Sequence, residues 1–261
     1  MTRPIGLAAL TVLELPHHEQ VSVAAQAGYS HVGLRLRPVT GQPYLFPIDL
    51  REIKARLADT GVKVLDVEVF RLAADTNVSE FEPVMAMAGE VGAGHLLVHG
   101  ADANEARMAD TFGRFCDLAA RYELVADLEP MPWVEVSTVA KTLALLRAAG
   151  RANSALLVDA IHFFRAGDRP EELASVPRHS LRYAQFCDAR AEKPSDMQEI
   201  IRQARSDRLM PGEGGLDLVA LLRALPEDLP LSLEIPYATP MPPLERARRA
   251  YQSTLRVLER L

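Results

Sequence analysis

Residues 124–129 read Leu-Val-Ala-Asp-Leu-Glu, a short apolar run that ends in an acidic residue. Three later runs also end in a polar residue: ALLVD at 155–159, RYAQ at 182–185 and LSLE at 231–234. If these runs are parallel strands of one closed sheet, their carboxyl ends lie on one rim. Four oxygen-donating side chains then converge on a point that suits a divalent cation. These side chains are Glu129, Asp159, Gln185 and Glu234.

The four runs belong to a series of eight short apolar segments, each bounded by turn or polar residues. Segments of this kind predict β-strands. The predicted strands are Ile5–Thr11, His31–Leu36, Val62–Phe70, His95–His99, Leu124–Glu129, Ala155–Asp159, Tyr183–Cys187 and Leu231–Ile235.

Between the strands, apolar residues recur at spacings of three and four, which predicts amphipathic helices. The predicted helices are Glu19–Ala27, Leu50–Ala58, Phe81–Val91, Asn104–Tyr122, Val136–Ala149, Ser195–Arg205, Leu216–Leu225 and Leu244–Leu258. Glycines follow four of the helical stretches, where a left-handed C-cap is expected. They are Gly28, Gly61, Gly92 and Gly150. Only the segment after the sixth strand is weak, and Pro170–Ala174 allows a short helix there.

Alternating strands and helices predict a parallel sheet, and eight such units close into a (β/α)8 TIM barrel. A length of 261 residues fits one barrel, so residues 1–261 are expected to form a single domain. A doubly wound open sheet is the alternative, but no Gly-x-Gly-x-x-Gly follows the first strand. The loop Pro38–Pro47 is long for a strand-to-helix connection and is a candidate lid at the barrel mouth.

Net charge, cysteine spacing and the N-terminal segment limit the kind of protein that we expect. A net charge of −6 and a pI near 5.7 argue against nucleic-acid binding, because such proteins usually carry a basic stripe. Cys116 and Cys187 fit no metal-ligand spacing, so we expect two buried thiols and no disulfide. The apolar stretch Ile5–Leu13 has no signal-peptide cleavage site after it, which favours a first strand and a cytoplasmic protein without a membrane segment. The sequence leaves the oligomeric state open, homo-oligomer included.

An ordered series of motifs resembles a known family. The motifs are LEPMPW at 128–133, VDAIHFFRAG at 158–167, AQFCDA at 184–189, RLMPGEGGLDL at 208–218 and LSLEIP at 231–236. Over nearly the whole chain they look like the xylose isomerase-like TIM barrels, often called sugar phosphate isomerases/epimerases. The resemblance implies a divalent metal held by Glu129, Asp159, Gln185 and Glu234, with Gln185 in the place where the superfamily has a histidine.

An amide oxygen in place of an imidazole makes the ligand set all oxygen, which favours one Mn²⁺, Mg²⁺ or Co²⁺ ion over zinc. The 3-dehydroshikimate dehydratases of the superfamily also carry glutamine here, so the change does not imply that the metal is lost. Without a cation, three crowded carboxylates would raise one another's pKa, whereas a dication keeps them ionised.

A hydroxy-carbonyl small molecule is the substrate class that such a metal suits, because carbonyl and hydroxyl oxygens can both chelate it and the resulting enolate is stabilised. The resemblance to the family's epimerases implies that Glu129 and Glu234 form the acid/base pair. His162 follows Asp159 by three residues, and in the family a histidine at this spacing contacts a substrate oxygen.

Weaker substrate-binding candidates stand at other strand ends: Glu68, His99, Trp133 and Arg190. Four arginines near the expected mouth are candidates for holding a carboxylate or phosphate by a two-pronged contact. They are Arg35, Arg37, Arg71 and Arg165. The PGEGG turn at 211–215 is not a predicted phosphate cradle, because Glu213 would repel a phosphate.

Three enzymatic hypotheses follow. The first is an isomerase or epimerase of a sugar or polyol ketone, favoured by the two glutamates. The second is a lyase that expels a β-hydroxyl, as in 3-dehydroshikimate or inosose dehydratases, favoured by Gln185 with His162. The third, an abasic-DNA endonuclease, would need further zinc ligands and a basic face. A non-catalytic binding barrel is the remaining alternative, and four oxygen ligands at strand ends argue against it.

Overall fold

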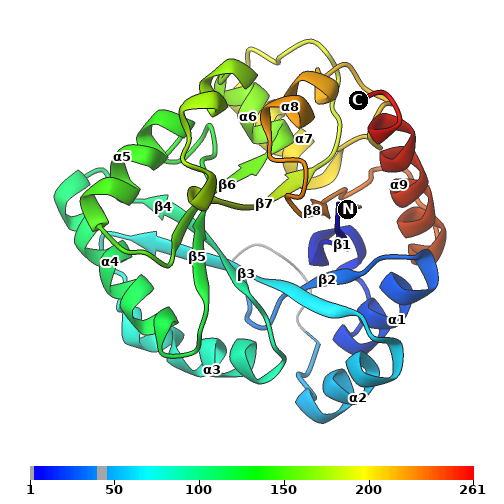
Figure 1. The fold of residues 1–261 in the computed structure, drawn as a ribbon, viewed down its shortest axis with the longest axis horizontal. Helices are drawn as coiled ribbons and strands as arrows, with labels where there is room; N and C mark the ends of the chain where they lie inside the picture. The colour runs from blue at the N-terminus through cyan, green and yellow to red at the C-terminus, as the bar shows by residue number, and fades with distance from the viewer. Residues whose placement is uncertain (1–2, 40–45) are drawn as a thin grey trace.

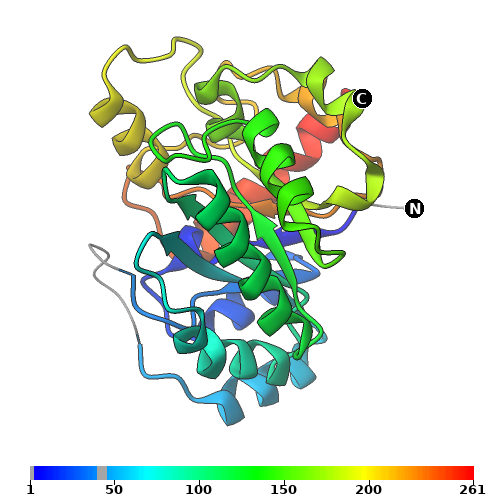
Figure 2. The same ribbon diagram turned by 90° about the vertical axis from the view of Figure 1, so that its left-hand side faces the viewer.

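Eight parallel strands close into a barrel in the order of the sequence, and the helices lie outside it (Figures 1 and 2). The computed structural model describes residues 3–39 and 46–261. The strands are β1 Ile5–Leu7, β2 His31–Leu34, β3 Lys63–Ala73, β4 His95–Ala101, β5 Val125–Leu128, β6 Ser154–Asp159, β7 Leu181–Phe186 and β8 Leu231–Leu233. The predicted (β/α)8 barrel is confirmed.

The described helices follow the strands around the outside of the barrel. The α-helices are α1 His17–Ala27, α2 Leu50–Thr60, α3 Glu82–Glu90, α4 Glu105–Ala120, α5 Val139–Ala149, α6 Ala160–Ala166, α7 Met197–Ser206, α8 Leu218–Ala224 and α9 Pro243–Leu258. Four 3₁₀ turns accompany them: η1 Ala9–Val12, η2 Val78–Phe81, η3 Pro170–Ser175 and η4 Arg178–Ser180.

Three of the four glycines predicted as helix C-caps are confirmed, whereas α3 has Val91 as its C-cap and Gly92 follows it. Gly28, Gly61 and Gly150 are C-caps with φ of 94°, 72° and 61°, and each donates its backbone N–H to a carbonyl of the last turn. Such left-handed backbone is open to glycine at little steric cost. At the other end, the side chains of Asp49 and Asn104 accept backbone N–H groups of the first turns of α2 and α4.

Helix α6 departs from the prediction. It begins at Ala160, directly after the last residue of β6, whereas the sequence suggested only a short helix at Pro170–Ala174, where η3 lies. The run from Ala160 to Phe164 is nearly all apolar, so its periodicity does not distinguish a helix from a continued strand. The deciding feature is Asp159, which both ends β6 and caps α6 by accepting the backbone N–H of His162.

An aromatic cluster anchors the long strand β3 to the outer layer. Phe70 of β3 lies edge-on to Phe81 of η2 and Phe115 of α4, with ring centroids 5.3 Å away in both cases. Edge-to-face pairs of this kind contribute about 0.5–1.5 kcal/mol each beyond burial. The register and position of β3 are therefore held by the core, which matters because β3 carries Glu68.

The interior of the barrel contains a buried polar layer. Tyr183 of β7 contacts residues of two strands across the barrel, since its hydroxyl lies 3.4 Å from Asp66 Oδ2 and its ring 5.1 Å from that of His95. His95 in turn pairs with Asp127 at 2.8 Å. Burial, followed by the charge of Glu68, raises the pKa of Asp66 to about 8. Asp127 lies two residues before Glu129, so this layer lies beneath the strand-end residues.

Other sequence predictions concern the surface and the thiols. Cys116 and Cys187 are both free and buried, as predicted. Of the helices described, none is long and apolar enough to cross a lipid bilayer. Residues 40–45 of the candidate lid Pro38–Pro47 lie outside the described residues.

Candidate metal centre

The four predicted ligands lie at the carboxyl ends of consecutive strands. Glu129 directly follows β5, Asp159 ends β6, Gln185 is the penultimate residue of β7, and Glu234 directly follows β8. All four side chains are buried, with residue exposures of 1–5%. The parallel order of the barrel brings these ends to one rim, as the spacing of the apolar runs predicts.

Asp159 joins the rim to helix α6. Its Oδ1 accepts the backbone N–H of His162 at 3.2 Å, which places the His162 side chain beside the carboxylate. The three-residue spacing between Asp159 and His162 is therefore the spacing of a helix N-cap and its third residue. Asp159 therefore both caps helix α6 and belongs to the candidate site.

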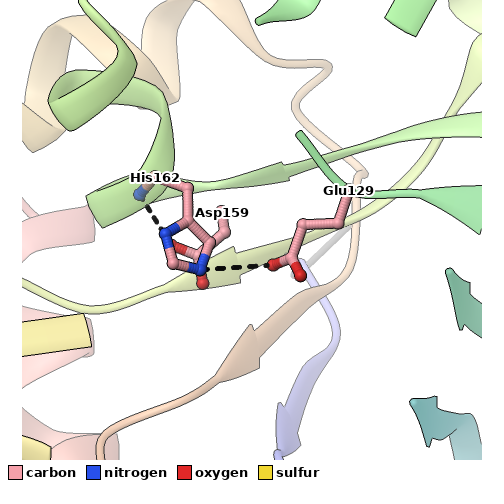
Figure 3. A group of neighbouring side chains, drawn as sticks. All are labelled: Glu129, Asp159 and His162. Carbon is pink, nitrogen blue, oxygen red and sulfur yellow. Dashed lines mark hydrogen bonds and ion pairs between the residues drawn. The ribbon is translucent and has the colours of Figure 1, made fainter. Parts of the chain in front are cut away.

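The imidazole of His162 faces Glu129, with Nε2 3.8 Å from Oε1 (Figure 3). Glu129, Asp159 and His162 each offer one ligand atom, and these atoms lie within 4.8 Å of one another. Trp133 packs edge-on against the His162 ring at 4.9 Å between centroids. The grouping thus includes a nitrogen donor that the predicted all-oxygen ligand set leaves out.

Glu129 is held from its other side by His99. His99 Nε2 lies 2.5 Å from Glu129 Oε2, while Glu129 Oε1 has no hydrogen-bond partner among the described residues. Burial is the main cause that lowers the pKa values of His99 and His162 to about 3, so both rings are neutral near pH 7. They act on Glu129 as dipoles and not as cations.

Gln185 presents an oxygen to the same space. Its Nε2 donates to Glu234 Oε1 at 2.8 Å, and its Oε1 is buried without a hydrogen-bond partner in the described chain. A buried acceptor without a donor is costly, and a cation removes that cost. The unpartnered oxygens of Gln185 and Glu129 therefore fit a bound metal ion.

Arg208 is a component that the sequence interpretation missed. Its Nη1 donates to Asp159 Oδ2 at 2.6 Å, and its Nη2 lies 2.7 Å from Glu234 Oε2. The side chain is fully buried, and the two carboxylates outweigh burial and raise its pKa. Arg208 opens the RLMPGEGGLDL motif, but its position outside a strand gave no signal that it reaches the rim.

The loop that carries Arg208 is tied to Asp188. Asp188 and Leu209 exchange backbone hydrogen bonds of 2.9 and 2.8 Å. The Asp188 carboxylate accepts backbone N–H groups of Gly212, Gly214 and Leu216 at 3.0–3.1 Å. A Cβ on Gly214 would lie 2.2 Å from the carbonyl oxygen of Ala189, so glycine is required there. Backbone N–H groups of the PGEGG turn therefore bind an anion that belongs to the chain, the Asp188 carboxylate.

The electrostatics of the rim favour a dication. Burial and then Asp159 raise the pKa of Glu129, and burial, opposed by Arg208 and reinforced by other carboxylates, raises that of Glu234. For Asp159 the opposite holds, because burial is outweighed by Arg208 and His162 together, which lower the pKa. If all three carboxylates are ionised, the Arg208 guanidinium leaves a net charge near −2, which a divalent ion would neutralise.

The remaining candidates divide into two groups. Glu68 and Arg35 pair with each other near the rim, with Arg35 Nη2 2.5 Å from Glu68 Oε1. Arg190 instead pairs with Asp207 at 2.9 Å and is half exposed. The other three arginines are placed differently from Arg35: Arg37 lies over the rings of Phe70 and Phe81, Arg165 donates to the Arg190 carbonyl, and Arg71 is exposed.

A family model described as xylose isomerase-like TIM barrel matches residues 21–261. The chain belongs to this family. This agrees with the resemblance carried by the strand-end motifs and with the closed barrel.

A curated relative is the 3-dehydroshikimate dehydratase of Pseudomonas aeruginosa, 27% identical over 236 residues, or 83% of this chain. The chain spans 36% of the length of that relative. Among solved structures, a zinc-bound IOLI protein has a TM-score of 0.83 at 19% identity, over 98% of both chains. A D-allulose 3-epimerase from Methylomonas sp. has a TM-score of 0.74 at 16% identity, over 98% of both chains. The curated relative is thus a dehydratase and one structural neighbour is an epimerase, and the structural likenesses show the fold alone.

Proposed function

We propose that this chain is a divalent-metal-dependent enzyme that moves a proton next to the carbonyl group of a small hydroxy-carbonyl substrate. The observation that carries the proposal is the meeting of three carboxylates and the unpartnered oxygen of Gln185 at one buried rim. The same geometry would be costly if its only purpose were structural, because the carboxylates repel one another.

The residues that would hold the ion are Glu129, Asp159, Gln185 and Glu234, and His162 lies near enough to contribute a nitrogen. When bound there, a divalent ion supplies a Lewis acid that stabilises negative charge developing on a carbonyl oxygen. The donors favour some ions over others: oxygen ligands favour Mn²⁺, Mg²⁺ or Co²⁺, and His162 would widen the range toward zinc.

The chain's own residues perform the proton transfers. Glu234 is our candidate for the group that takes the proton from the carbon next to the carbonyl. Glu129 lies with His162 as a second proton-handling unit, with Oε1 and Nε2 3.8 Å apart. Trp133 packs on His162, and on this side of the site its apolar ring would keep water from the reacting carbon.

Dehydration is our first candidate for the overall reaction. In it, Glu234 takes the proton from one carbon, and the hydroxyl on the adjacent carbon leaves as water with a proton supplied from the Glu129–His162 side. Support comes from the P. aeruginosa 3-dehydroshikimate dehydratase, whose 27% identity is a relation in sequence and not in fold alone. The amide at Gln185 supports it too, because the resemblance to the superfamily's 3-dehydroshikimate dehydratases implies a glutamine at this place.

Epimerisation is the second candidate. It needs one group to remove the proton and another to return it on the opposite face, and Glu129 and Glu234 follow β5 and β8, which are not neighbours in the barrel. The epimerases among the structural neighbours show that this barrel can support such chemistry in other proteins.

One experiment separates the two reactions. Protein loaded with Mn²⁺ is incubated with 3-dehydroshikimate and, separately, with ketohexoses. Dehydration of 3-dehydroshikimate gives a conjugated product that absorbs in the ultraviolet, whereas epimerisation gives a new sugar on chromatography. Absence of both products, with the metal bound, would overturn the proposed function. The double variant Glu129→Ala, Glu234→Ala is the negative control.

A further inference from the structure

The Arg35–Glu68 pair lies beside the metal centre but is not part of it. Arg35 directly follows β2, and Glu68 lies in β3, the strand that pairs with β2 through Leu34 and Val67. The two side chains form an ion pair of 2.5 Å with residue exposures of 4% and 1%. The Arg35 backbone is fixed as well, since its carbonyl accepts from His17 Nε2 at 2.8 Å.

The pair is close enough to act on the centre. The negative charge of Glu68 contributes to raising the pKa values of both Glu129 and Glu234. Arg35 and Glu68 both act on His99, the residue that contacts Glu129. In the closed order of the barrel, β2 and β3 lie opposite β6 and β7, so the pair faces the Arg208 side across the rim.

The ion pair leaves polar atoms unpartnered. Nε and Nη1 of Arg35 and Oε2 of Glu68 are buried without hydrogen-bond partners among the residues the structure describes. Buried polar groups normally have partners, so each such atom calls for an explanation. Here donors and an acceptor are unpartnered on two side chains that already contact each other.

The ligand that satisfies both kinds of atom is a hydroxyl group. A hydroxyl accepts from the guanidinium and donates to the carboxylate, whereas a substrate carboxylate would accept from Arg35 but be repelled by Glu68 Oε2. The pair is also neutral overall, so it offers little net attraction to an anion. This distinguishes Arg35 from an arginine that stands free to bind a carboxylate by two prongs.

We propose that Arg35 and Glu68 form a substrate subsite that binds a hydroxyl group lying across the rim from Arg208. The inference rests on the proposed function and adds the substrate class: a polyhydroxylated ketone with a hydroxyl recognised at β2 and β3. Any carboxylate of the substrate is then held elsewhere.

The test measures binding apart from turnover. Trp133 is the only tryptophan of the chain and packs on His162, so its fluorescence reports binding of D-fructose or 3-dehydroshikimate to the Mn²⁺-loaded protein. Calorimetry provides the same dissociation constants independently. The variants are Glu68→Gln, Arg35→Lys and, as a matched control, Glu90→Gln, which alters an exposed ion pair with Lys54.

We expect Glu68→Gln to weaken ligand binding by about 10- to 100-fold, because the amide nitrogen cannot accept the hydroxyl hydrogen. One monodeoxy analogue of the ligand should bind wild type and Glu68→Gln equally, which identifies the hydroxyl. Mn²⁺ affinity should stay within about twofold, and Glu90→Gln should match the wild type. Arg35→Lys, which keeps the charge but loses two donor positions, should show the same loss and serves if Glu68→Gln does not fold.

Tighter ligand binding by Glu68→Gln, in place of the expected weaker binding, overturns the proposal. If the pair anchored a carboxylate, Glu68→Gln would remove a repulsion and tighten the binding of 3-dehydroshikimate. Equal dissociation constants for wild type and Glu68→Gln, or no binding of either ligand by the wild type, contradict the subsite. Failure of the proposed function would give a different result. The wild type would then bind the ligand in a way that depends on Glu68 but would not turn it over.

Discussion

Arg208 donates to Asp159 through a 2.6 Å hydrogen bond inside the ring of predicted metal ligands. The same guanidinium reaches Glu234, so one buried cation spans two of the three carboxylates. Its single positive charge lowers the repulsion among the carboxylates but does not neutralise all of their negative charge. A metal ion bound at this rim would therefore stabilise the same cluster as Arg208 does.

Replacing Arg208 should separate these two contributions. Arg208→Met leaves the carboxylates of Asp159 and Glu234 buried without their partner, and we expect the metal-free protein to lose about 3 kcal/mol of unfolding free energy. Mn²⁺ should restore more stability in this variant than it adds to the wild type. Chemical denaturation with and without Mn²⁺ measures both. Equal stabilisation by Mn²⁺ in the two proteins would show that Arg208 and the ion act independently; Arg178→Met, at an exposed pair, is the control.

One divalent ion is expected per chain. Dialysis against Mn²⁺ followed by metal analysis should give a stoichiometry near one in the wild type, because the ligands form a single group. The double variant Glu129→Ala, Glu234→Ala should lose the ion while retaining its far-ultraviolet circular dichroism. An unchanged metal content in that variant would place the ion elsewhere.

Glu234→Gln should abolish turnover with little change in fold. The amide preserves the shape of the side chain and one oxygen ligand but cannot accept a proton, so kcat should fall by about 100-fold or more. Steady-state kinetics on the substrate identified above measures the loss, and Mn²⁺ titration checks that the ion still binds. A variant with near-normal kcat would assign the base to another residue.

Gln185 should set metal preference. Gln185→His adds an imidazole and should shift the preference from Mg²⁺ and Mn²⁺ toward Zn²⁺. Gln185→Leu removes a neutral ligand at similar volume and should weaken all three ions by about tenfold. Calorimetry of Mg²⁺, Mn²⁺ and Zn²⁺ binding to the three proteins is the measurement. Identical profiles would mean that Gln185 acts only through its hydrogen bond to Glu234.

Asp66 should make stability depend on pH. Burial, then Glu68, raises its pKa from 3.8 to about 8 in the folded protein, so the folded state binds the proton more tightly than the unfolded state. The resulting stability is present at low pH and is lost as pH rises through about 4 to 8, at up to about 1.4 kcal/mol per pH unit. Asp66→Asn should flatten this slope in urea denaturation from about pH 5 to pH 8. The exposed Asp59→Asn serves as control, and parallel curves for wild type and Asp66→Asn would refute the assignment.

Sequence periodicity predicted the strands and the ligand rim because a parallel barrel repeats one local unit eight times. The candidate metal ligands stand at strand ends, and their position follows from the strand boundaries alone. Arg35 and Glu68 were each named as candidates from the sequence, but their pairing and the role of Arg208 could not be found in this way, because both depend on which side chains meet across the rim. Helix α6 was missed because Ile161, Phe163 and Phe164 are all apolar, so their spacing does not distinguish a helix from a strand. Only the Asp159 cap shows that a helix starts there.

The bond between Asp188 and Leu209 closes a loop in the chain. The polypeptide leaves the barrel after Asp188, passes through α7 and returns at Leu209, so both ends of this excursion are fastened to each other. Changes of length or sequence at residues 192–196 need not move Arg208, because it is held at the base of the excursion and by the Ala204 carbonyl of α7, which accepts from its Nε at 2.7 Å. The segment is therefore a modular appendage in which new contacts can evolve, or be engineered, while the geometry of the rim is preserved.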